Sequence, residues 1–537
     1  MTRIARKWMA IIAVLAMIMS CCACGRPVLT GNDGADFGSE GETFTHTSTN
    51  SDGKFSFFYD VNSSLNPMTT GEPDNQMVCG LVYESVLTID NGLKAQPGVV
   101  KKWETEDGIN WILTVDDGHI FSDGNEVSAY DVAYSINCAA SNRYQSKLSG
   151  WLSSAYANED GTVTVELKRK NYQFYMLLEL PVIQSETLYN SHPVGSGPYV
   201  FGEDGVTLTP NDYHKDSKNL PVETVYLQSY ESVDDYISKF NDSTVDLVIN
   251  DPSNSASLGF GSSISTRSFN TTNLHFVIFN MYDSCFQDHK LMHAFSRAFD
   301  RKFMVETLMQ GNALEAVTPI SPASPLYNKK FYDELCYDMS ACRKELAEIG
   351  VDDYDSDGLA EYKLGGNSED EDEEDDGVVL DLDLTFLVCS DSPAKVELAE
   401  KFAEEISAIG IPVSVKSLAY EDYQTALADG AFDMAYCEVK LTPDFDLTCI
   451  LSPGGQANYS RSSDYNHDDN ISAFLSADDS TRQAACDAMC QYVADEGTII
   501  PIIFEKHQMI THEGVVSNIT VNQENPLFCF QEWKIAK

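Results

Sequence analysis

The sequence has few basic residues for its length. Its 537 residues include 35 lysines and arginines against 83 aspartates and glutamates, which gives a formal net charge of −48. A surface this negative opposes binding to nucleic acid and to anionic lipid. We therefore expect no nucleic-acid partner, although the charge says little about the fold.

Long apolar segments and disulfide spacing are also missing. Apart from one run near the N-terminus, no segment approaches the roughly 20 apolar residues that a membrane span needs. Fourteen cysteines are present, and three of them lie at positions 21–24, which leaves 11 that are scattered. An odd number without framework spacing argues against a disulfide scaffold.

The motifs of common enzyme classes are absent as well. We find no P-loop, and the pair His512-Glu513 lacks the second histidine of the zinc-protease motif. Sequence alone leaves open a hidden Ser-His-Asp triad. We expect a protein that is not an enzyme and that needs no cofactor.

The N-terminus has the pattern of a secretory signal. A basic segment at 3–7 precedes a short apolar run at 9–19. The Ile-Met-Ser-Cys sequence that ends at Cys21 resembles a bacterial lipobox, in which a signal peptidase cuts before a cysteine that becomes lipidated. We expect residues 1–20 to be a lipoprotein signal peptide and 21–45 to be a flexible tether. A plain signal or an uncleaved anchor is the alternative, and either one places the remaining chain outside the cytoplasm.

The second half of the sequence alternates between strand and helix patterns. Ser392 and Pro393 predict the start of a helix, and Gly410 predicts its end. Between them, apolar residues recur every three or four positions, as on one face of a helix. A run of β-α-β-α-β units predicts a parallel sheet covered by helices. The expected strands are 382–386, 411–415 and 432–439, and the expected helices are 393–409 and 421–428.

Two further segments give local predictions. Residues 288–309 are expected to form one helix that begins at Asp288 and stops at Gly311. Residues 369–376 are eight consecutive acidic residues, which repel one another and predict a solvated loop over 368–377. A Ca²⁺ site in that loop is the alternative.

Several blocks, each weak alone, occur in a recognisable order. They are 64–67 (SLNP), 82–87 (VYESVL), 121–124 (FSDG), 129–132 (AYDV), 195–199 (GSGPY), 294–301 (AFSRAFDR) and 353–358 (DYDSDG). We interpret GSGPY as a tight turn. From about residue 55 to the C-terminus, the chain resembles family 5 of the bacterial extracellular solute-binding proteins, which includes oligopeptide, dipeptide and nickel receptors.

The resemblance implies a fold and a function class. The fold is α/β and periplasmic-binding-protein-like of type II, with two lobes joined by a hinge and an extra inserted subdomain. The implied ranges are 46–72, 195–270 and 497–537 for lobe I, 73–194 for the inserted subdomain and 271–496 for lobe II, with crossovers near 269–273 and 495–501. Such a protein binds an oligopeptide by hinge closure. It then delivers the peptide to the permease and ATPase subunits of an ABC importer.

The resemblance also suggests site residues. The strand that contacts the solute in the family matches Tyr436, Cys437, Glu438, Val439 and Lys440. Further candidates for contact with the solute are Asn280 in the same lobe and Asp60, Val61 and Asn62 in the other lobe. Many peptide receptors of the family have an aspartate, which pairs with the ligand's α-ammonium group, where this chain has Val439. Valine cannot neutralise a buried cation.

Other residues could supply the missing charge. Glu438, Asp444 and Asp446 are candidate partners for an ammonium group, and the alternative is that Glu438 and Lys440 are both solvated. His289 and His293 share a helical face and could bind a metal, but exposed helix histidines are commoner than two-ligand sites. We expect a monomeric, lipid-anchored receptor on the outer face of the cell membrane. A peptide sensor without transport is a further alternative.

Overall fold

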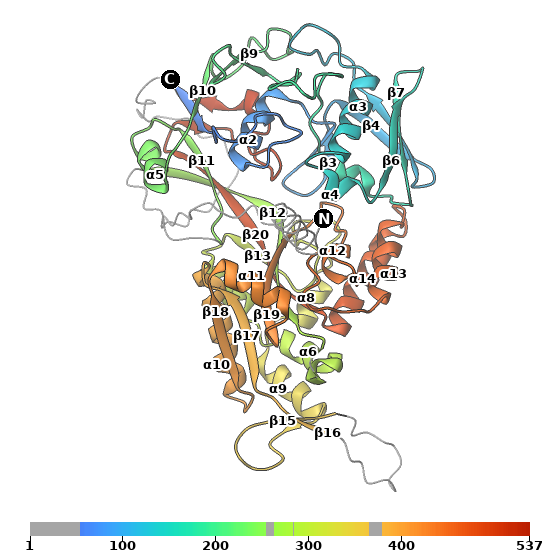
Figure 1. Ribbon diagram of the computed structural model, residues 1–537, viewed down its shortest axis with the longest axis vertical. Coiled ribbons are helices and arrows are strands. Elements are labelled where there is room, and N and C mark those ends of the chain that lie inside the picture. Colours follow the sequence, from blue (N-terminus) through green and yellow to red (C-terminus); the bar gives the residue numbers. More distant parts are fainter. Residues whose placement is uncertain (1–53, 254–262, 283, 365–377, 537) are drawn as a thin grey trace, which may run out of the picture. The chain divides into compact units, whose positions relative to one another are not determined.

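A computed structural model describes residues 54–253, 263–282, 284–364 and 378–536 (Figure 1). The predicted signal peptide, tether and acidic loop lie outside these residues. The chain divides into two compact units, unit 1 (Met1–Thr271 and His507–Lys537) and unit 2 (Thr272–Lys506). It passes from one unit to the other within strand β12 (Ile264–Phe279) and again within β20 (Ile499–His512).

Unit 1 contains a mixed sheet built around β1 (Phe55–Phe58). All four residues of β1 are buried, as expected for a central strand with both faces covered. β1 pairs in parallel with β10 (Val225–Gln228) and β11 (Leu247–Asn250), and β11 pairs antiparallel with β20. The other members are β9 (Thr207–Pro210) and β8 (Tyr199–Phe201).

Helices close unit 1 around this sheet. The ring of Phe58 stacks on Tyr236 of α5 (Val233–Asn241) with centroids 4.2 Å apart, and Phe240 of the same helix belongs to the same apolar cluster. The side chain of Ser232 caps α5 by accepting from the Asp235 N–H. Helix α2 (Pro73–Val82) begins with proline at its first position.

A second, antiparallel sheet of unit 1 lies within residues 73–194. Its strand order is β4-β5-β7-β6. Ser128 and Asp131 form a reciprocal capping box at the start of α3, which packs on this sheet. The elements of this part are β2 (Leu87–Ile89), β3 (Ala95–Pro97), β4 (Val100–Thr105), β5 (Asn110–Val115), α3 (Ala129–Ala140), α4 (Gln145–Leu148), β6 (Leu152–Ala157), β7 (Thr162–Leu167) and the 3₁₀ helix Phe174–Leu177.

Unit 2 contains the predicted β-α-β-α-β run. β17 (Leu384–Cys389) pairs in parallel with β18 (Val413–Leu418) and with β19 (Met434–Lys440), while α10 (Pro393–Ser407) and α11 (Tyr420–Asp429) are the two helices (Figure 1). The prediction of a parallel sheet is therefore confirmed. Ser392 is the N-cap residue, but its side chain makes no capping hydrogen bond.

The prediction of one helix over 288–309 is wrong. Helix α6 (His289–Ser296) ends early, and α7 (Arg301–Phe303) and a π-helical turn (Met304–Leu308) follow. The break lets the buried Arg301 guanidinium donate to the carbonyls of Ser296, Ala316 and Pro501. Arg301 thereby satisfies the Ser296 carbonyl at the end of α6, which a continuous helix would have bonded internally.

The remaining elements complete both units. Unit 2 has an aromatic core in which Phe299 stacks on Phe402 at 4.3 Å. No described helix has the length and apolarity of a membrane span. In unit 2 the other elements are the 3₁₀ helix Ser284–Gln287, β13 (Ala313–Glu315), α8 (Lys330–Leu335), α9 (Met339–Glu348), β14 (Val351–Asp352), β15 (Glu361–Leu364), β16 (Val378–Asp381), α12 (Thr448–Leu451), α13 (Asn466–Leu475) and α14 (Arg482–Glu496), and in unit 1 they are β21 (Val516–Ser517), the 3₁₀ helix Phe530–Glu532 and β22 (Lys534–Ile535).

Candidate functional site

The five residues predicted to contact solute all lie on β19 in unit 2. The antiparallel register with β12 runs along the whole strand, from Met434 opposite Phe279 to Lys440 opposite Asn273. Because side chains alternate along a strand, Tyr436, Glu438 and Lys440 project from one face and Cys437 and Val439 from the other. The two halves of the predicted site segment therefore face different surroundings.

Glu438 is part of a buried polar network. Its carboxylate pairs with the ammonium group of Lys395, and the Nε2 atom of His275 lies 3.6 Å from it. Burial alone would raise the pKa of Glu438, but Lys395 and then His275 outweigh it and hold the pKa below its ordinary value. The carboxylate is therefore charged and engaged in unit 2.

His275 links the rest of this network. It is fully buried, its Nδ1 atom lies 3.2 Å from the Tyr436 hydroxyl and its Nε2 atom lies 3.8 Å from the Glu505 carboxylate. Asn273 donates to the same Glu505 carboxylate at 2.9 Å. The structure thus joins Tyr436 and Glu438 through one imidazole. Sequence reasoning missed this histidine because it lies about 160 residues before Tyr436.

The interpretation that Glu438 and Lys440 are both solvated is half wrong. Lys440 is exposed, whereas the Glu438 side chain is only 27% exposed and is ion-paired. Val439 is buried and lies opposite the fully buried Leu274 in the register with β12. An apolar side chain at this position suits its surroundings.

The two other candidate acids stabilise their own loop. Asp444 is buried and accepts from the N–H of Asp446, and Asp446 accepts from the N–H of Thr448 at 3.0 Å. Phe445 between them has a φ of 55°, a left-handed conformation that is uncommon for this residue type. Each of the two carboxylates therefore accepts one backbone N–H group of its own loop.

Asn280, predicted as a further contact residue, ties β12 to the start of β19. Its amide donates to the carbonyls of Gly430 and Phe432 at 3.3 and 3.2 Å, and its backbone N–H donates to the Asp433 carbonyl. These bonds fix the loop that precedes β19.

The candidates of unit 1 form a turn after β1. The Asp60 carboxylate accepts from the Asn62 N–H and the Ser63 hydroxyl, both at 2.8 Å. The side-chain amide of Asn75 accepts from the Asp60 N–H and donates to the Asp60 carbonyl. Val61 at the tip is 60% exposed. The turn lies at the carboxyl end of a parallel strand, a usual location for ligand contacts in α/β sheets.

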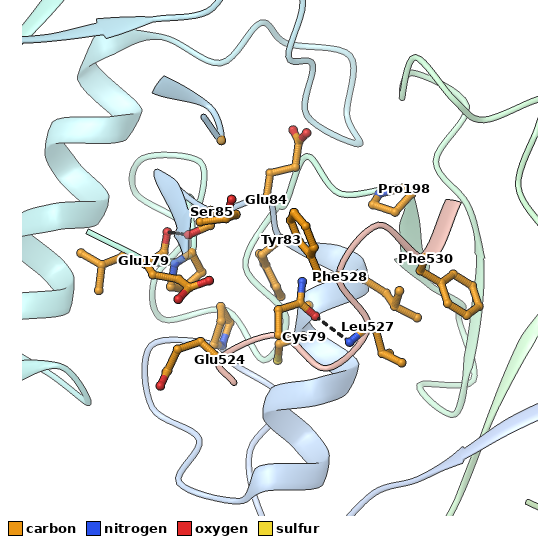
Figure 2. A pocket seen from close by; sticks show the side chains of 18 of the residues that line it. Cys79, Tyr83, Glu84, Ser85, Glu179, Pro198, Glu524, Leu527, Phe528 and Phe530 are labelled. Carbon is orange, nitrogen blue, oxygen red and sulfur yellow. Dashed lines mark hydrogen bonds between the residues drawn. The ribbon is translucent and has the colours of Figure 1, made fainter. Parts of the chain in front are cut away.

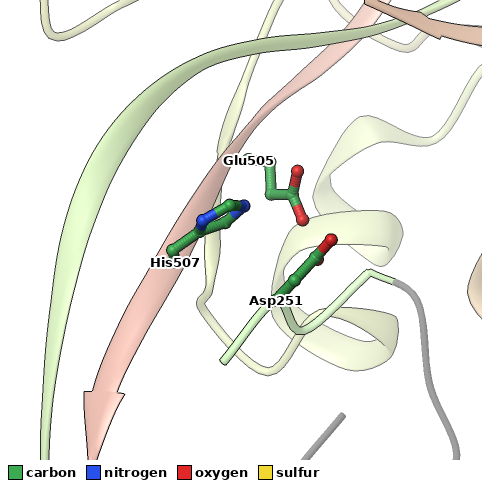
Figure 3. A group of neighbouring side chains, drawn as sticks. All are labelled: Asp251, Glu505 and His507. Atoms are coloured by element: carbon green, nitrogen blue, oxygen red, sulfur yellow. The ribbon is translucent and has the colours of Figure 1, made fainter. Parts of the chain in front are cut away.

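The structure also places the predicted metal pair. His289 and His293 lie near different acids, Glu496 at 3.9 Å and Glu345 at 3.2 Å, and among the described residues neither belongs to a group of three or more potential metal ligands. Glu505 and His507 are two residues apart on β20 and share a face of that strand (Figure 3).

An acidic turn lies at 353–358. The carboxylates of Asp353, Asp355, Asp357 and Glu361 lie together and accept backbone N–H groups of the turn, and Gly358 has a φ of 94°. These hydrogen bonds account for the conformation of the turn.

Unit 1 also contains a cavity of about 290 Å³ that the sequence did not predict (Figure 2). At one end, the Glu84 carboxylate lies 2.7 Å from the His119 Nδ1 atom and 3.8 Å from the His214 Nε2 atom. Burial opposes the charged form of Glu84, but the two imidazoles outweigh it and lower its pKa to about 2. No short motif joins positions 84, 119 and 214, so only the fold brings them together.

Comparisons with known proteins fit this architecture. Residues 94–440, well over half of the chain, match the family described as "Bacterial extracellular solute-binding proteins, family 5 Middle". Two curated relatives are the oligopeptide-binding protein AppA of Bacillus subtilis (23% identity, 48% of this chain and 51% of that one) and heme-binding protein A of Haemophilus influenzae (21%, 50% and 56%). This chain matches about half the length of each of these relatives.

Solved structures resemble the whole described fold. The ABC transporter substrate-binding protein CtaP of Listeria monocytogenes has a TM-score of 0.72 at 16% identity, and NikA of Brucella suis in complex with Fe(III)-EDTA has 0.68 at 19%. Each covers 90% of this chain and 99% of its own. AppA of Bacillus subtilis in complex with a nonapeptide has a TM-score of 0.59 at 18% identity, with the same coverage. The chain belongs to family 5 of the bacterial extracellular solute-binding proteins and has their type II periplasmic-binding fold.

Proposed function

We propose that this protein is the solute-binding subunit of an ABC importer, anchored by a lipid on Cys21 to the outer face of the cell membrane, and that it captures oligopeptides. Residues Tyr436 to Lys440 and Asn280 in unit 2 and Asp60 to Asn62 in unit 1 are the proposed contact residues. The proposal assigns no catalytic step to the protein and takes it to be a monomer.

One observation supports this proposal most directly. The two compact units of this family member are joined by two continuous strands, β12 and β20. Two such connections allow a hinge motion in which a solute favours the closed form through contacts that only this form makes. The permease would then recognise the closed form.

The peptide assignment is supported by strand chemistry. An extended peptide gains affinity from main-chain hydrogen bonds to strand edges and requires little of its own sequence. One relative, AppA of Bacillus subtilis, is described as an oligopeptide-binding protein, and its solved structure is described as a complex with a nonapeptide. In this chain, Val439 and the ion-paired Glu438 offer a peptide's α-ammonium group no carboxylate on β19 that is not already engaged.

That same feature favours a second candidate, a receptor for a non-peptide solute. A solute without an ammonium group loses nothing at Val439. The descriptions of other relatives name heme, a chelated iron and nickel complexes with histidine. A metal complex or other small solute is therefore the alternative ligand class.

Native mass spectrometry of the full-length protein, purified in mild detergent from its host, separates these candidates. A ladder of bound masses spaced by amino-acid residues is the expected result for a peptide receptor. One discrete non-peptide mass or a bound metal would replace the peptide assignment with the second candidate.

The anchor has its own test. Growth with an alkyne-labelled fatty acid should label the wild-type protein and the variant Cys22→Ser, whereas Cys21→Ser should lose the label. Equal labelling of Cys21→Ser and Cys22→Ser would disprove the assignment of Cys21.

A further inference from the structure

The cavity of unit 1 has charged groups of both signs on its wall. It includes Arg143 after α3, Glu179 after the 3₁₀ helix Phe174–Leu177, and Glu524 in the C-terminal segment. All three lie in unit 1, although Glu524 is more than 300 residues from the other two in the chain. A volume of about 290 Å³ is at the small end of ligand pockets, about 300–1,000 Å³.

The Arg143 guanidinium is held in place by neutral groups. It donates to the Tyr144 hydroxyl at 3.1 Å and to the Gln76 amide oxygen, and it lies over the Tyr144 ring at 4.8 Å. The Gln76 amide is itself fixed by the Gly71 carbonyl at 2.8 Å. None of the ion pairs within the described ranges involves Arg143. A fixed guanidinium fork is well suited to a carboxylate.

The acidic side of the cavity is also ordered. Glu179 is 7% exposed, and its Oε1 atom accepts from the Ile89 N–H at 3.2 Å and from the Asn522 amide at 3.5 Å. In Figure 2, Glu179 and Glu524 lie on the same side of the Phe528 ring.

All three charged groups affect the pKa of Tyr144. Burial raises the pKa of Tyr144 to about 12, Arg143 lowers it, and Glu524 and Glu179 raise it. Arg143 donates to the Tyr144 hydroxyl, and Arg143, Glu179 and Glu524 all line the same cavity. A small ligand inside the cavity is therefore enclosed by a wall that carries both signs of charge.

The middle of the wall is less polar. Tyr83 and Phe528 contribute rings, and Leu527 contributes an aliphatic side chain (Figure 2). These side chains suit a short hydrocarbon body between two charged ends.

We propose that this cavity of unit 1 binds a small zwitterion, an amino acid or a dipeptide, with its carboxylate on Arg143 and its ammonium group facing Glu179 and Glu524. The site uses residues of unit 1 alone and does not depend on the proposed oligopeptide function. A free carboxylate and a free ammonium group on one small molecule are both required.

Isothermal titration of dialysed full-length protein in detergent tests the ligand class. The probes are the twenty amino acids and the dipeptides Gly-Gly and Ala-Ala. We expect at least one to bind at one site per chain. Its amide, which lacks the carboxylate, and its N-acetyl form, which lacks the ammonium group, should each bind at least about tenfold more weakly. No binding by any probe, or equal binding of the amide, would overturn the proposal.

Variants locate the binding in the cavity. Arg143→Gln should weaken binding of the best probe at least about tenfold, because it removes a charge-assisted pair. Arg343→Gln, the same change on the exposed surface of α9, should leave binding unchanged. Unchanged binding by Arg143→Gln would refute the site.

A second variant, with a smaller change at the same position, tests the site even if Arg143→Gln misfolds. Arg143→Lys keeps the charge but loses the fork, so its affinity should lie between those of the wild type and of Arg143→Gln. Wild-type affinity in Arg143→Lys would also contradict the proposed geometry. If Arg143→Gln retains its bound peptide ladder in native mass spectrometry but loses the zwitterion, the two sites are separate; if it loses neither, only this inference fails.

Discussion

The ammonium group of Lys395 lies against the carboxylate of Glu438 inside unit 2. Lys395 is 5% exposed, and it reaches β19 from the first turn of α10. The ion pair determines what the predicted solute-binding strand can offer, because the acidic group next to Val439 is already neutralised.

Breaking this ion pair should destabilise unit 2. Lys395→Met leaves Glu438 and Glu505 near His275 without the ammonium group. We expect a loss of about 2 kcal/mol in the free energy of unfolding, below the 3–5 kcal/mol of a fully buried pair because Glu438 is 27% exposed. Urea denaturation measures it. Lys344→Met, which removes a 75% exposed lysine of α9, is the control and should change stability by less than about 0.5 kcal/mol.

Restoring a carboxylate at position 439 should change selectivity. Val439→Asp is expected to improve binding of peptides with a free N-terminus about tenfold over their N-acetylated forms, if the family's ammonium site is in this place. Val439→Asn, similar in size but uncharged, should show no such preference. Fluorescence titration measures both. An equal response of the two variants would mean that position 439 does not face the ligand's ammonium group.

The acid stability of unit 1 should depend on Glu84. Its pKa is about 2 in the folded protein against 4.5 ordinarily. A lowered pKa stabilises the fold fully above pH 4.5, and this contribution of about 3 kcal/mol is lost as the pH falls towards 2. Glu84→Gln should therefore lower stability at pH 7 and flatten the stability curve between pH 4.5 and 2.

Chemical denaturation at several pH values measures this effect. Glu104→Gln, at an exposed glutamate of the same unit, should leave the curve parallel to that of the wild type. If the Glu84→Gln curve is also parallel, the two histidines do not stabilise the charged carboxylate.

The glycines of the GSGPY block should not tolerate substitution by residues with a side chain. A Cβ atom on Gly197 would lie 2.5 Å from the Leu81 carbonyl oxygen at the end of α2. Gly197→Ala should therefore cost about 2–3 kcal/mol. Gly150→Ala, where nothing lies within 4 Å, is the control and should stay within about 1 kcal/mol of the wild type. Similar melting temperatures for both variants would contradict the close approach.

This block also shows the limit of a local interpretation. The sequence suggested a tight turn, but Gly195 and Gly197 lie in irregular backbone outside any hydrogen-bonded turn and are not among the glycines with positive φ. Their role is to let two backbones touch. A pattern of neighbouring residues cannot distinguish a turn from a close contact with a helix more than 100 residues away.

The sequence by itself determined the family and the parallel sheet of unit 2. Pro393 at the start of α10, the apolar spacing along it and Gly410 with a φ of 95° after it are local signals, and local signals suffice where each residue's preference agrees with the fold. Only the tertiary structure decided the rest. The break in the helix at 288–309 depends on carbonyls that Arg301 reaches across unit 2, the state of Glu438 depends on Lys395 and His275, and the cavity of unit 1 depends on Arg143, Glu179 and Glu524. These groups are distant in the chain, so their electrostatic and packing energies exist only once the fold has brought them together.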